Sequence, residues 1–428
     1  MAFFTAIGSG QTLTGTTEND SFVLLNGSAI SVLAQAGDDR VFGTGFQADG
    51  GSYSMAGGAD SVVVDTLSAQ ATVFGGAGGD EVQASAIYTA VVSLGNGNDF
   101  VSASYLLDSQ ITLGAGSDNV EISAAQSSTF EFGAGADTFS VLGGGSVGRA
   151  SGYIQYSEVA MGGGADSFEA SAAYSSSIAM GAGVDTFAVS GLYGSTVQGG
   201  GNSDTIFVEN MSGGSRINGG AGADVIDVNF AISAEEIFGD AGNDTITVLS
   251  GSAGADVLAA GGDGVDDITI EDQTGNNAVL FGGAGADTLF AGAQSNFFRY
   301  DAASESNIDN VDNVTVSANQ SAFIALSSYA GGGAVFVQAN SDVGAFSTNA
   351  VGVVTFSGAI GSTLEERATL LSSALGDYRA VIFNADGGRY LFVAGNVKNQ
   401  ITDDLLIEVD ASVDFLSGAG NRRLEFGD

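Results

Sequence analysis

The sequence predicts a mostly β protein, a parallel β-roll or β-solenoid of about 14 coils followed by a smaller α+β domain. Three observations predict this fold. A glycine-rich loop ending in aspartate recurs along about two thirds of the chain, as in GGAGADVIDV (Gly219–Val228). Short runs that alternate apolar and polar residues follow these aspartates. The chain has 67 glycines but no proline and no collagen-like triplet, so the glycines separate strands.

The spacing of the loop aspartates gives the length of one coil. Successive aspartates are 19 to 22 residues apart, with one gap of 29, and a sustained period in this range is typical of a solenoid. The aspartates are Asp20, Asp39, Asp60, Asp80, Asp99, Asp118, Asp137, Asp166, Asp185, Asp204, Asp224, Asp244, Asp266 and Asp287.

Each coil is predicted to contain two short strands. In DTFSV (Asp137–Val141), alternation places Phe139 and Val141 on one face and Thr138 and Ser140 on the other. A Ser/Gly/Ala-rich turn follows, and a second strand such as SIAM (Ser177–Met180) leads to the next loop. Stacked coils therefore give two parallel sheets with their apolar faces packed together.

The loop occurs in two forms, which we expect to account for most of the variation in coil length. Coils with G-x-G-x-D, as in Gly95–Asp99, have 19 residues, and coils with GGxGxD, as in Gly239–Asp244, have 20. The loops before Asp99, Asp118, Asp137, Asp166 and Asp185 are accordingly predicted to be one residue short. The gap of 29 indicates an insertion within residues 142–160, with Tyr153 and Tyr156 near its tip, that serves as a contact site or is a tolerated surface loop.

The pattern predicts two domains, residues 1–297 and residues 298–428. Residues 1–14 are expected to form a leading strand, and Ser295–Val314 a cap that covers the last coil with Phe297, Phe298 and Tyr300.

The second domain carries the signals of one helix and one hairpin. Ser362–Leu375 is predicted to be helical, with Ser362 and Glu365 forming a capping box. Arg379–Gly395 is predicted to be a hairpin that turns at Asp386, Gly387 and Gly388.

Composition restricts the ligands and partners. The formal charge is −40, and residues 1–297 contain 34 acidic residues against three basic ones. This charge disfavours nucleic-acid binding. Because the chain has no cysteine and no histidine, only oxygen ligands remain for a metal, which favours calcium or magnesium. No apolar run is long enough to predict a membrane span, and the N-terminus does not resemble a conventional signal peptide.

Calcium is expected at the recurring loops. Glycines allow the backbone to approach an ion closely, and the aspartates supply carboxylates. One loop has too few oxygens for calcium, which takes six to eight, so we expect each ion to bridge two coils. The alternative is that each aspartate caps its own turn without a metal. A row of carboxylates on the order of 5 Å apart would repel itself without cations, which favours calcium.

The residues of this calcium prediction are the 14 aspartates and the first glycines of the full-length loops. Those glycines are Gly75, Gly219, Gly239, Gly261 and Gly282.

The loop sequence resembles the nonapeptide of RTX (repeats-in-toxin) calcium-binding proteins. The clearest matches are Gly75–Asp80, Gly219–Asp224, Gly239–Asp244, Gly261–Asp266 and Gly282–Asp287. The resemblance implies a β-roll that folds on binding calcium after type I secretion. RTX repeats recur every nine residues, with glycine loops on both edges of the roll. Here only one edge carries them regularly, and Gly251–Asp256 is the main exception.

The C-terminal segment Asp386–Ser412 resembles the tails of exported RTX-type proteins, in which a Y-x-F-V strand is followed by a D-D-L strand. This resemblance implies an uncleaved C-terminal export signal and hence an extracellular protein that needs no N-terminal signal peptide.

The predicted function is a non-enzymatic, extracellular calcium-binding structural protein that assembles with its own copies into a surface layer, matrix or filament. A cell-surface polysaccharide is a candidate partner, and neither nucleic acid nor membrane insertion is expected. One alternative is an adhesin, an ice-binding protein, or a fibre or virion surface protein. The other is a polysaccharide-acting β-helix enzyme with paired carboxylates. The pairs Glu235–Glu236 and Glu365–Glu366 are interpreted as solvated surface instead.

Overall fold

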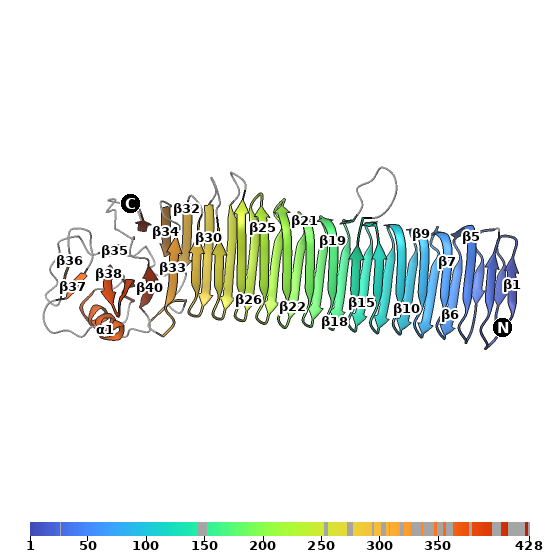
Figure 1. Ribbon diagram of the computed structural model, residues 1–428, viewed down its shortest axis with the longest axis horizontal. Helices are drawn as coiled ribbons and strands as arrows, with labels where there is room; N and C mark the ends of the chain where they lie inside the picture. Colours follow the sequence, from blue (N-terminus) through green and yellow to red (C-terminus); the bar gives the residue numbers. More distant parts are fainter. Residues whose placement is uncertain are drawn as a thin grey trace. The chain divides into compact units, whose positions relative to one another are not determined.

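The computed structural model describes residues 1–25, 27–143, 152–251, 256–271, 277–292, 295–300, 305–307, 309–316, 321–326, 335–336, 346–348, 354–356, 363–375, 379–395, 404–409 and 424–426. Its strands confirm the predicted fold class: a parallel β-solenoid of about 14 turns, with one short helix and antiparallel strands in the C-terminal region (Figure 1). No helix among these residues is long and apolar enough to cross a membrane.

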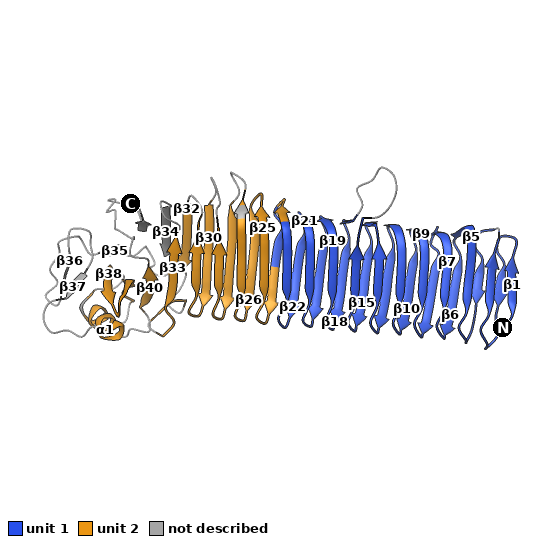
Figure 2. Ribbon diagram, in the orientation of Figure 1, with its two compact units in different colours: residues 1–209, 214–217 blue, residues 210–213, 218–428 orange. Residues whose placement is uncertain are grey.

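The chain divides into two compact units, which are coloured separately in Figure 2. Unit 1 comprises residues 1–209 and 214–217, and unit 2 comprises residues 210–213 and 218–428. Each coil contributes one strand, or two short ones, to a first sheet, just after its aspartate, and one strand to a second sheet, just before the next aspartate.

The coils of unit 1 supply the following strands. The first sheet contains β1 (Phe3–Ala6), β3 (Ser21–Leu24), β5 (Arg40–Asp49), β7 (Ser61–Ser68), β9 (Glu81–Tyr88), β11 (Phe100–Leu107), β13 (Asn119–Ile122), β14 (Ala124–Gln126), β16 (Thr138–Val141), β17 (Tyr153–Gln155), β19 (Ser167–Tyr174), β21 (Thr186–Tyr193) and β23 (Thr205–Ser212). The second sheet contains β2 (Thr12–Thr14), β4 (Ser31–Leu33), β6 (Ser52–Gly57), β8 (Thr72–Ala77), β10 (Val91–Asn96), β12 (Gln110–Ala115), β15 (Thr129–Ala134), β18 (Glu158–Gly163), β20 (Ser177–Ala182), β22 (Thr196–Gly201) and β24 (Arg216–Ala221). The division between the units falls within β23 and β24.

Neighbouring strands pair in parallel at equivalent positions of the repeat. Val101 pairs with Val82 on one side and with Val120 on the other, so the same residue of each coil lies above its counterpart. The predicted alternation is confirmed, since Phe139 and Val141 are buried while Thr138 is exposed. The ring of Phe139 lies 5.3 Å from that of Phe168 in the next coil, so the core repeats from coil to coil.

Unit 2 begins with further coils of the same kind. Its first-sheet strands are β25 (Val225–Ala231), β27 (Thr245–Gly251), β29 (Asp267–Ile270), β31 (Thr288–Ala291) and β33 (Asp312–Val316). Its second-sheet strands are β26 (Glu235–Ala241), β28 (Val257–Asp263), β30 (Asn277–Ala284), β32 (Ser295–Tyr300) and β34 (Ser321–Leu326).

The expected cap at Ser295–Val314 is in fact another coil. Strand β32 pairs in parallel with β30 and with β34, and β33 pairs in parallel with β31. Phe298 and Tyr300 are buried because they alternate inward along β32, as core residues do in earlier coils. The predicted boundary after residue 297 therefore lies inside a strand that stacks on both sides.

The end of unit 2 contains the remaining elements. These are β35 (Val335–Phe336), β36 (Phe346–Thr348), β37 (Val354–Phe356), α1 (Leu364–Ala374), β38 (Arg379–Ala385), β39 (Gly388–Val393), β40 (Leu405–Val409) and β41 (Leu424–Phe426). Strands β38, β39 and β40 pair antiparallel, and β40 also pairs in parallel with β33. Leu371 and Leu375 at the end of α1 pack with Phe383 and Phe392 of the hairpin.

The predicted hairpin and helix of this region are confirmed, and the start of the helix is shifted by one residue. The hairpin turns at Asp386 and Gly387, both at positive φ, as a two-residue turn requires. The helix begins one residue later than predicted, because Thr363 caps it and forms the capping box with Glu366. The predicted cap, Ser362, lies outside the described residues.

The structure places the extra residues earlier in the coil than the predicted tip at the two tyrosines. Tyr153 belongs to the regular strand β17, which pairs with β14 and β19, and Tyr156 occupies the following turn. Neither tyrosine is at the tip, because the extra residues lie between Gly143 and Gly152, and residues 144–151 are outside the described part.

Candidate functional site: a ladder of buried aspartates

The structure places the 14 predicted aspartates at one position of the repeat, directly before the first-sheet strand. All of them are buried, with 1 to 3% of their surface exposed. Burial of so many carboxylates is unusual, because an ionised carboxylate loses hydration when it leaves water. The arrangement of their oxygens shows how part of this cost is offset.

Within unit 1, the Oδ1 atom of an aspartate accepts a hydrogen bond from the backbone N–H of the aspartate in the preceding coil. The backbone N–H of Asp80 donates to Oδ1 of Asp99 at 2.8 Å, and the N–H of Asp99 donates to Oδ1 of Asp118 at 2.8 Å. The same bond recurs from Asp20 to Asp204, with lengths of 2.6 to 3.0 Å. We call this continuous series of hydrogen bonds the aspartate ladder, and each aspartate in it a rung.

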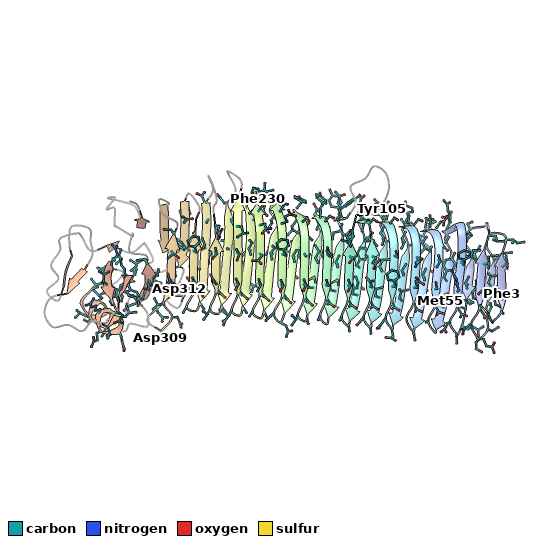
Figure 3. All side chains as sticks on the ribbon, viewed as in Figure 1. Phe3, Met55, Tyr105, Phe230, Asp309 and Asp312 are labelled. Atoms are coloured by element: carbon teal, nitrogen blue, oxygen red, sulfur yellow. The ribbon has the colours of Figure 1, made fainter. Side chains whose placement is uncertain are left out.

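Unit 2 contains the same ladder and one rung that the sequence reasoning missed. The N–H groups of Asp224, Asp244 and Asp266 donate to the next aspartate along the chain, and the N–H of Asp287 donates to Oδ1 of Asp312 at 3.0 Å. Asp312, labelled in Figure 3, lies at the start of β33. The alternating Asn-Val-Thr-Val run after it was the available signal, but its spacing of 25 residues and its lack of a glycine loop concealed it.

The loops predicted to be short have the same length as the full-length loop before Asp80, which corrects that prediction. Gly95 pairs with Gly76 and Ser93 with Phe74, so Leu94 occupies the register position of Gly75. The short-looking loops carry a buried apolar residue in place of the first glycine: Leu94, Leu113, Phe132, Met161 and Met180.

The length variation that the structure describes at these coils lies at the opposite edge of the solenoid. The coil after Asp60 makes its turn there with two residues at positive φ, Ala69 and Gln70, whereas the coil after Asp80 uses only Thr89.

Two glycine positions show why the loop sequence is restricted. A Cβ atom on Gly75 would lie 2.2 Å from Oδ2 of Asp80, and similar contacts to the following aspartate occur at Gly219, Gly239, Gly261 and Gly282. Gly97 has a φ of +135°, and a Cβ there would lie 1.9 Å from the carbonyl oxygen of Gly78. The first glycines leave space beside the aspartate in their own coils, although five other coils carry a larger apolar residue at this position, whereas the inner glycines allow the coils to stack closely.

The second carboxylate oxygen has no hydrogen-bond partner along most of the ladder. Within the described part of the chain, this is so for the buried Oδ2 atoms of Asp39, Asp60, Asp80, Asp99, Asp118, Asp137, Asp166, Asp185, Asp244, Asp266 and Asp287. An ionised oxygen in such a place is costly, so the ladder favours any state that neutralises it.

Burial raises the pKa of most ladder aspartates, while the hydrogen bond from the backbone of the preceding aspartate acts in the opposite direction. The pKa rises to about 7 in Asp80 and Asp166 and to about 8 in Asp312. It rises to about 6 in Asp39, Asp118, Asp244, Asp266 and Asp287. Charges on neighbouring aspartates raise several of these pKa values further.

Asp20 at the first rung differs from the others. Burial acts to raise its pKa, but the backbone of Thr16 and Ala2 and the hydroxyl of Thr16 donate hydrogen bonds to the carboxylate and lower the pKa overall. Its second oxygen is therefore satisfied within the chain, unlike those of the next rungs.

The ladder supplies ligands of the right chemical kind for calcium, but few of them per ion. Oδ1 accepts a backbone hydrogen bond, which leaves Oδ2 as the available carboxylate oxygen. A Cβ atom built on Gly75 would lie 2.2 Å from Oδ2 of Asp80 and 2.7 Å from the carbonyl oxygen of Leu94. These two oxygens, from adjacent coils, therefore face the same small space beside Gly75. Among the residues that the structure describes, no three acidic side chains gather to hold a metal. Backbone carbonyl oxygens would have to complete the coordination.

A second ladder, of serines, stabilises the opposite edge of unit 1 and was not predicted. The N–H of Ser109 donates to Oγ of Ser128, and Ser128 Oγ in turn donates to the carbonyl oxygen of Gln126 at 2.9 Å. The same pattern recurs at Ser157, Ser176 and Ser195. The signal was a serine ten residues after the aspartate in most of these coils.

The paired glutamates do not share one environment. Glu365 and Glu366 are exposed in the first turn of α1, as expected. Glu235 is 1% exposed and accepts a hydrogen bond from the hydroxyl of Ser233, so its interpretation as solvated surface was wrong. The loop Gly251–Asp256 lies mostly outside the described residues; within it, Asp256 accepts a hydrogen bond from Asn277 at 2.8 Å.

The chain matches no protein-family model, no curated protein and no solved structure.

Proposed function

We propose that the chain is a non-catalytic structural protein of the cell exterior, whose solenoid binds calcium along the aspartate ladder and assembles with its own copies into a layer or filament. The observation that carries this proposal is the ladder itself. Buried carboxylates recur at one position of consecutive coils and link each coil to the next. Such a repeated arrangement fits a structural role, whereas a catalytic site would be confined to a few residues at one place.

Electrostatics supports the calcium part of the proposal. The ladder carboxylates are buried, and each is next to others of the same charge at the spacing of neighbouring strands, about 4.7–4.9 Å. Divalent cations near Oδ2 would offset both the lost hydration and the mutual repulsion. The ligands would be the Oδ2 atoms of the ladder together with backbone carbonyl oxygens of the glycine loops.

The extracellular part rests on the resemblance of the tail to exported RTX-type proteins. The two tail segments that carry this resemblance form the antiparallel strands β39 and β40. The proposed self-assembly follows from the repetitive, acidic surface, which divalent cations would allow to approach other copies.

Calcium binding can be tested on the full chain by titration calorimetry and by metal analysis after dialysis. The double variant Asp118→Asn/Asp137→Asn keeps a side-chain oxygen that can accept each ladder hydrogen bond and removes two negative charges. The control Glu121→Gln/Glu131→Gln removes the same charge from exposed positions of the same coils. We expect the ladder variant, but not the control, to bind fewer calcium ions.

Circular dichroism and electron microscopy then test the two halves of the proposal. A β spectrum that is unchanged by a chelator, together with no calcium uptake, would refute the calcium part. Calcium-loaded chains that stay monomeric at all concentrations would refute assembly.

A further inference from the structure

An open groove on the outer face of the first sheet of unit 1 lies away from the aspartate ladder. It encloses about 620 Å³ and crosses the coils that begin at Asp60, Asp80, Asp99, Asp118 and Asp137. The five coils cover ~19 Å along the stacking direction at 4.7–4.9 Å between neighbouring strands. Its size is within the usual range of about 300–1,000 Å³ for ligand sites.

The groove follows a line where the strand pairing is interrupted. Val64 pairs with Ala84 and Thr66 with Ala86, but Asp65 and Ser85 between them are not paired. The next coils repeat this interruption at Ser104. An irregularity lies beyond each end of the groove: the register shift of β5 at one end, and the base of the insertion, after Leu142, at the other.

Hydroxyl groups dominate the polar lining. Ser85, Ser104 and Ser123 form one row, five residues after their aspartates, and Ser102 and Ser140 belong to a parallel row two residues earlier. In the described part of the chain, the hydroxyls of Ser85, Ser102 and Ser104 make no hydrogen bond within the protein. They are available to a ligand as both donors and acceptors.

The charges of the groove exclude an anionic ligand. Asp65 and Glu121 are exposed in its lining, and no lysine or arginine lines it. A nucleic acid or an acidic polysaccharide would meet uncompensated negative charge there.

The backbone and the lining also disfavour a peptide. A peptide would need a free strand edge, an apolar groove or a basic cluster, and β9 and β11 in the groove are paired on both sides. The floor between the serine rows consists of Val64, Ala84, Ala103 and Ile122, which are almost fully buried and form no deep apolar pocket.

We propose that this groove binds an uncharged polysaccharide, with the chain lying along the stacking direction of the coils. The rows of hydroxyls repeat once per coil, so successive sugar rings would meet equivalent donors and acceptors. The proposal therefore rests on the hydroxyl rows and on the uncharged character of the ligand that the lining favours.

The test is affinity electrophoresis of the full chain through native gels that contain a mixed-linkage β-glucan, a galactomannan or a dextran, with polygalacturonate as the anionic comparison. Ser104→Phe fills the middle of the groove. Ser190→Phe is the matched control, because Ser190 lies five residues after Asp185, is exposed and lies outside the groove. We expect at least one uncharged polysaccharide to retard the native chain, and Ser104→Phe to weaken that binding about tenfold or more, a loss of about 1.4 kcal/mol.

Ser190→Phe should bind as the native chain does. If Ser104→Phe does not fold by circular dichroism, the triple variant Ser85→Ala/Ser104→Ala/Ser123→Ala provides the same comparison by removing one row of hydroxyls. The proposal is overturned if none of the uncharged polysaccharides binds, if only polygalacturonate binds, or if folded groove variants bind as well as the native chain.

Discussion

Replacing Asp166 by asparagine should stabilise the chain in calcium-free buffer at pH 8. Oδ1 of Asp166 accepts the backbone N–H of Asp137 at 2.8 Å, and Oδ2 is buried without a partner. Asparagine keeps an oxygen for the first interaction and removes the charge from the second. The control is the corresponding carboxylate-to-amide substitution at exposed Glu169 in the same coil. Glu169→Gln should change the free energy of unfolding little.

The magnitude follows from the pKa of Asp166, which burial raises from 3.8 to about 7. The stabilisation from the protonated group is fully present below pH 3.8 and is lost as the pH rises through 7. Above pH 7 the ionised group lowers the free energy of unfolding by at most about 4 kcal/mol relative to low pH, and solvent screening and the coupled titration of neighbouring rungs reduce this value. Asp166→Asn should recover part of this loss, and Asp166→Ala should be about 1–3 kcal/mol less stable than Asp166→Asn because it leaves the N–H of Asp137 unpaired.

The assay is guanidinium denaturation followed by circular dichroism, at pH 5 and pH 8, with a chelator or with calcium. We expect Asp166→Asn to be more stable than the native chain only at pH 8 with chelator. In calcium the order should reverse, because the variant lacks one ligand oxygen. If Asp166→Asn is less stable than the native chain at pH 8 with chelator, the buried charge is not the dominant cost and the reasoning is refuted.

Three further predictions concern the repeat. In chelator, the melting temperature should fall between pH 5 and pH 8, because the raised ladder pKa values, several of them about 6 to 8, lose their stabilising protons over that window; a flat profile would contradict this. Gly97→Ala should cost about 2–4 kcal/mol because its Cβ would meet the carbonyl of Gly78, while Asn96→Ala should be nearly neutral in the same denaturation experiment. Ser128→Ala should cost about 1–3 kcal/mol by leaving the N–H of Ser109 unpaired, and hydrogen exchange should show faster exchange at Ser109.

Sequence signals predicted the structure well wherever residues close together in the chain determine it. The alternation around Phe139 gave the inward and outward faces, because side chains alternate along any strand. The Asp386–Gly387 turn was equally local, since both residues tolerate positive φ. The capping box was predicted one residue early because Ser362 and Thr363 are adjacent candidates for the cap.

Errors arose where neighbouring coils determine the outcome. Leu94 looked like the end of a strand before a shortened loop, but in the stack it occupies the place of Gly75 and its side chain fills the core. Asp312 was missed because its spacing departs from the period, although its side chain bonds to Asp287 like any other rung. Both features become visible only when the coils are aligned in register.

The sequence by itself determined the parallel solenoid, most of its coils and the recurrence of the aspartates on one edge, because a fixed period requires each repeat to adopt the same path. The tertiary structure alone decided what those aspartates contact. Each carboxylate completes a hydrogen bond in the neighbouring coil, and stacking buries its second oxygen. Hydrogen bonding and burial between residues about 20 positions apart depend on the stacked coils, so no single repeat could reveal them.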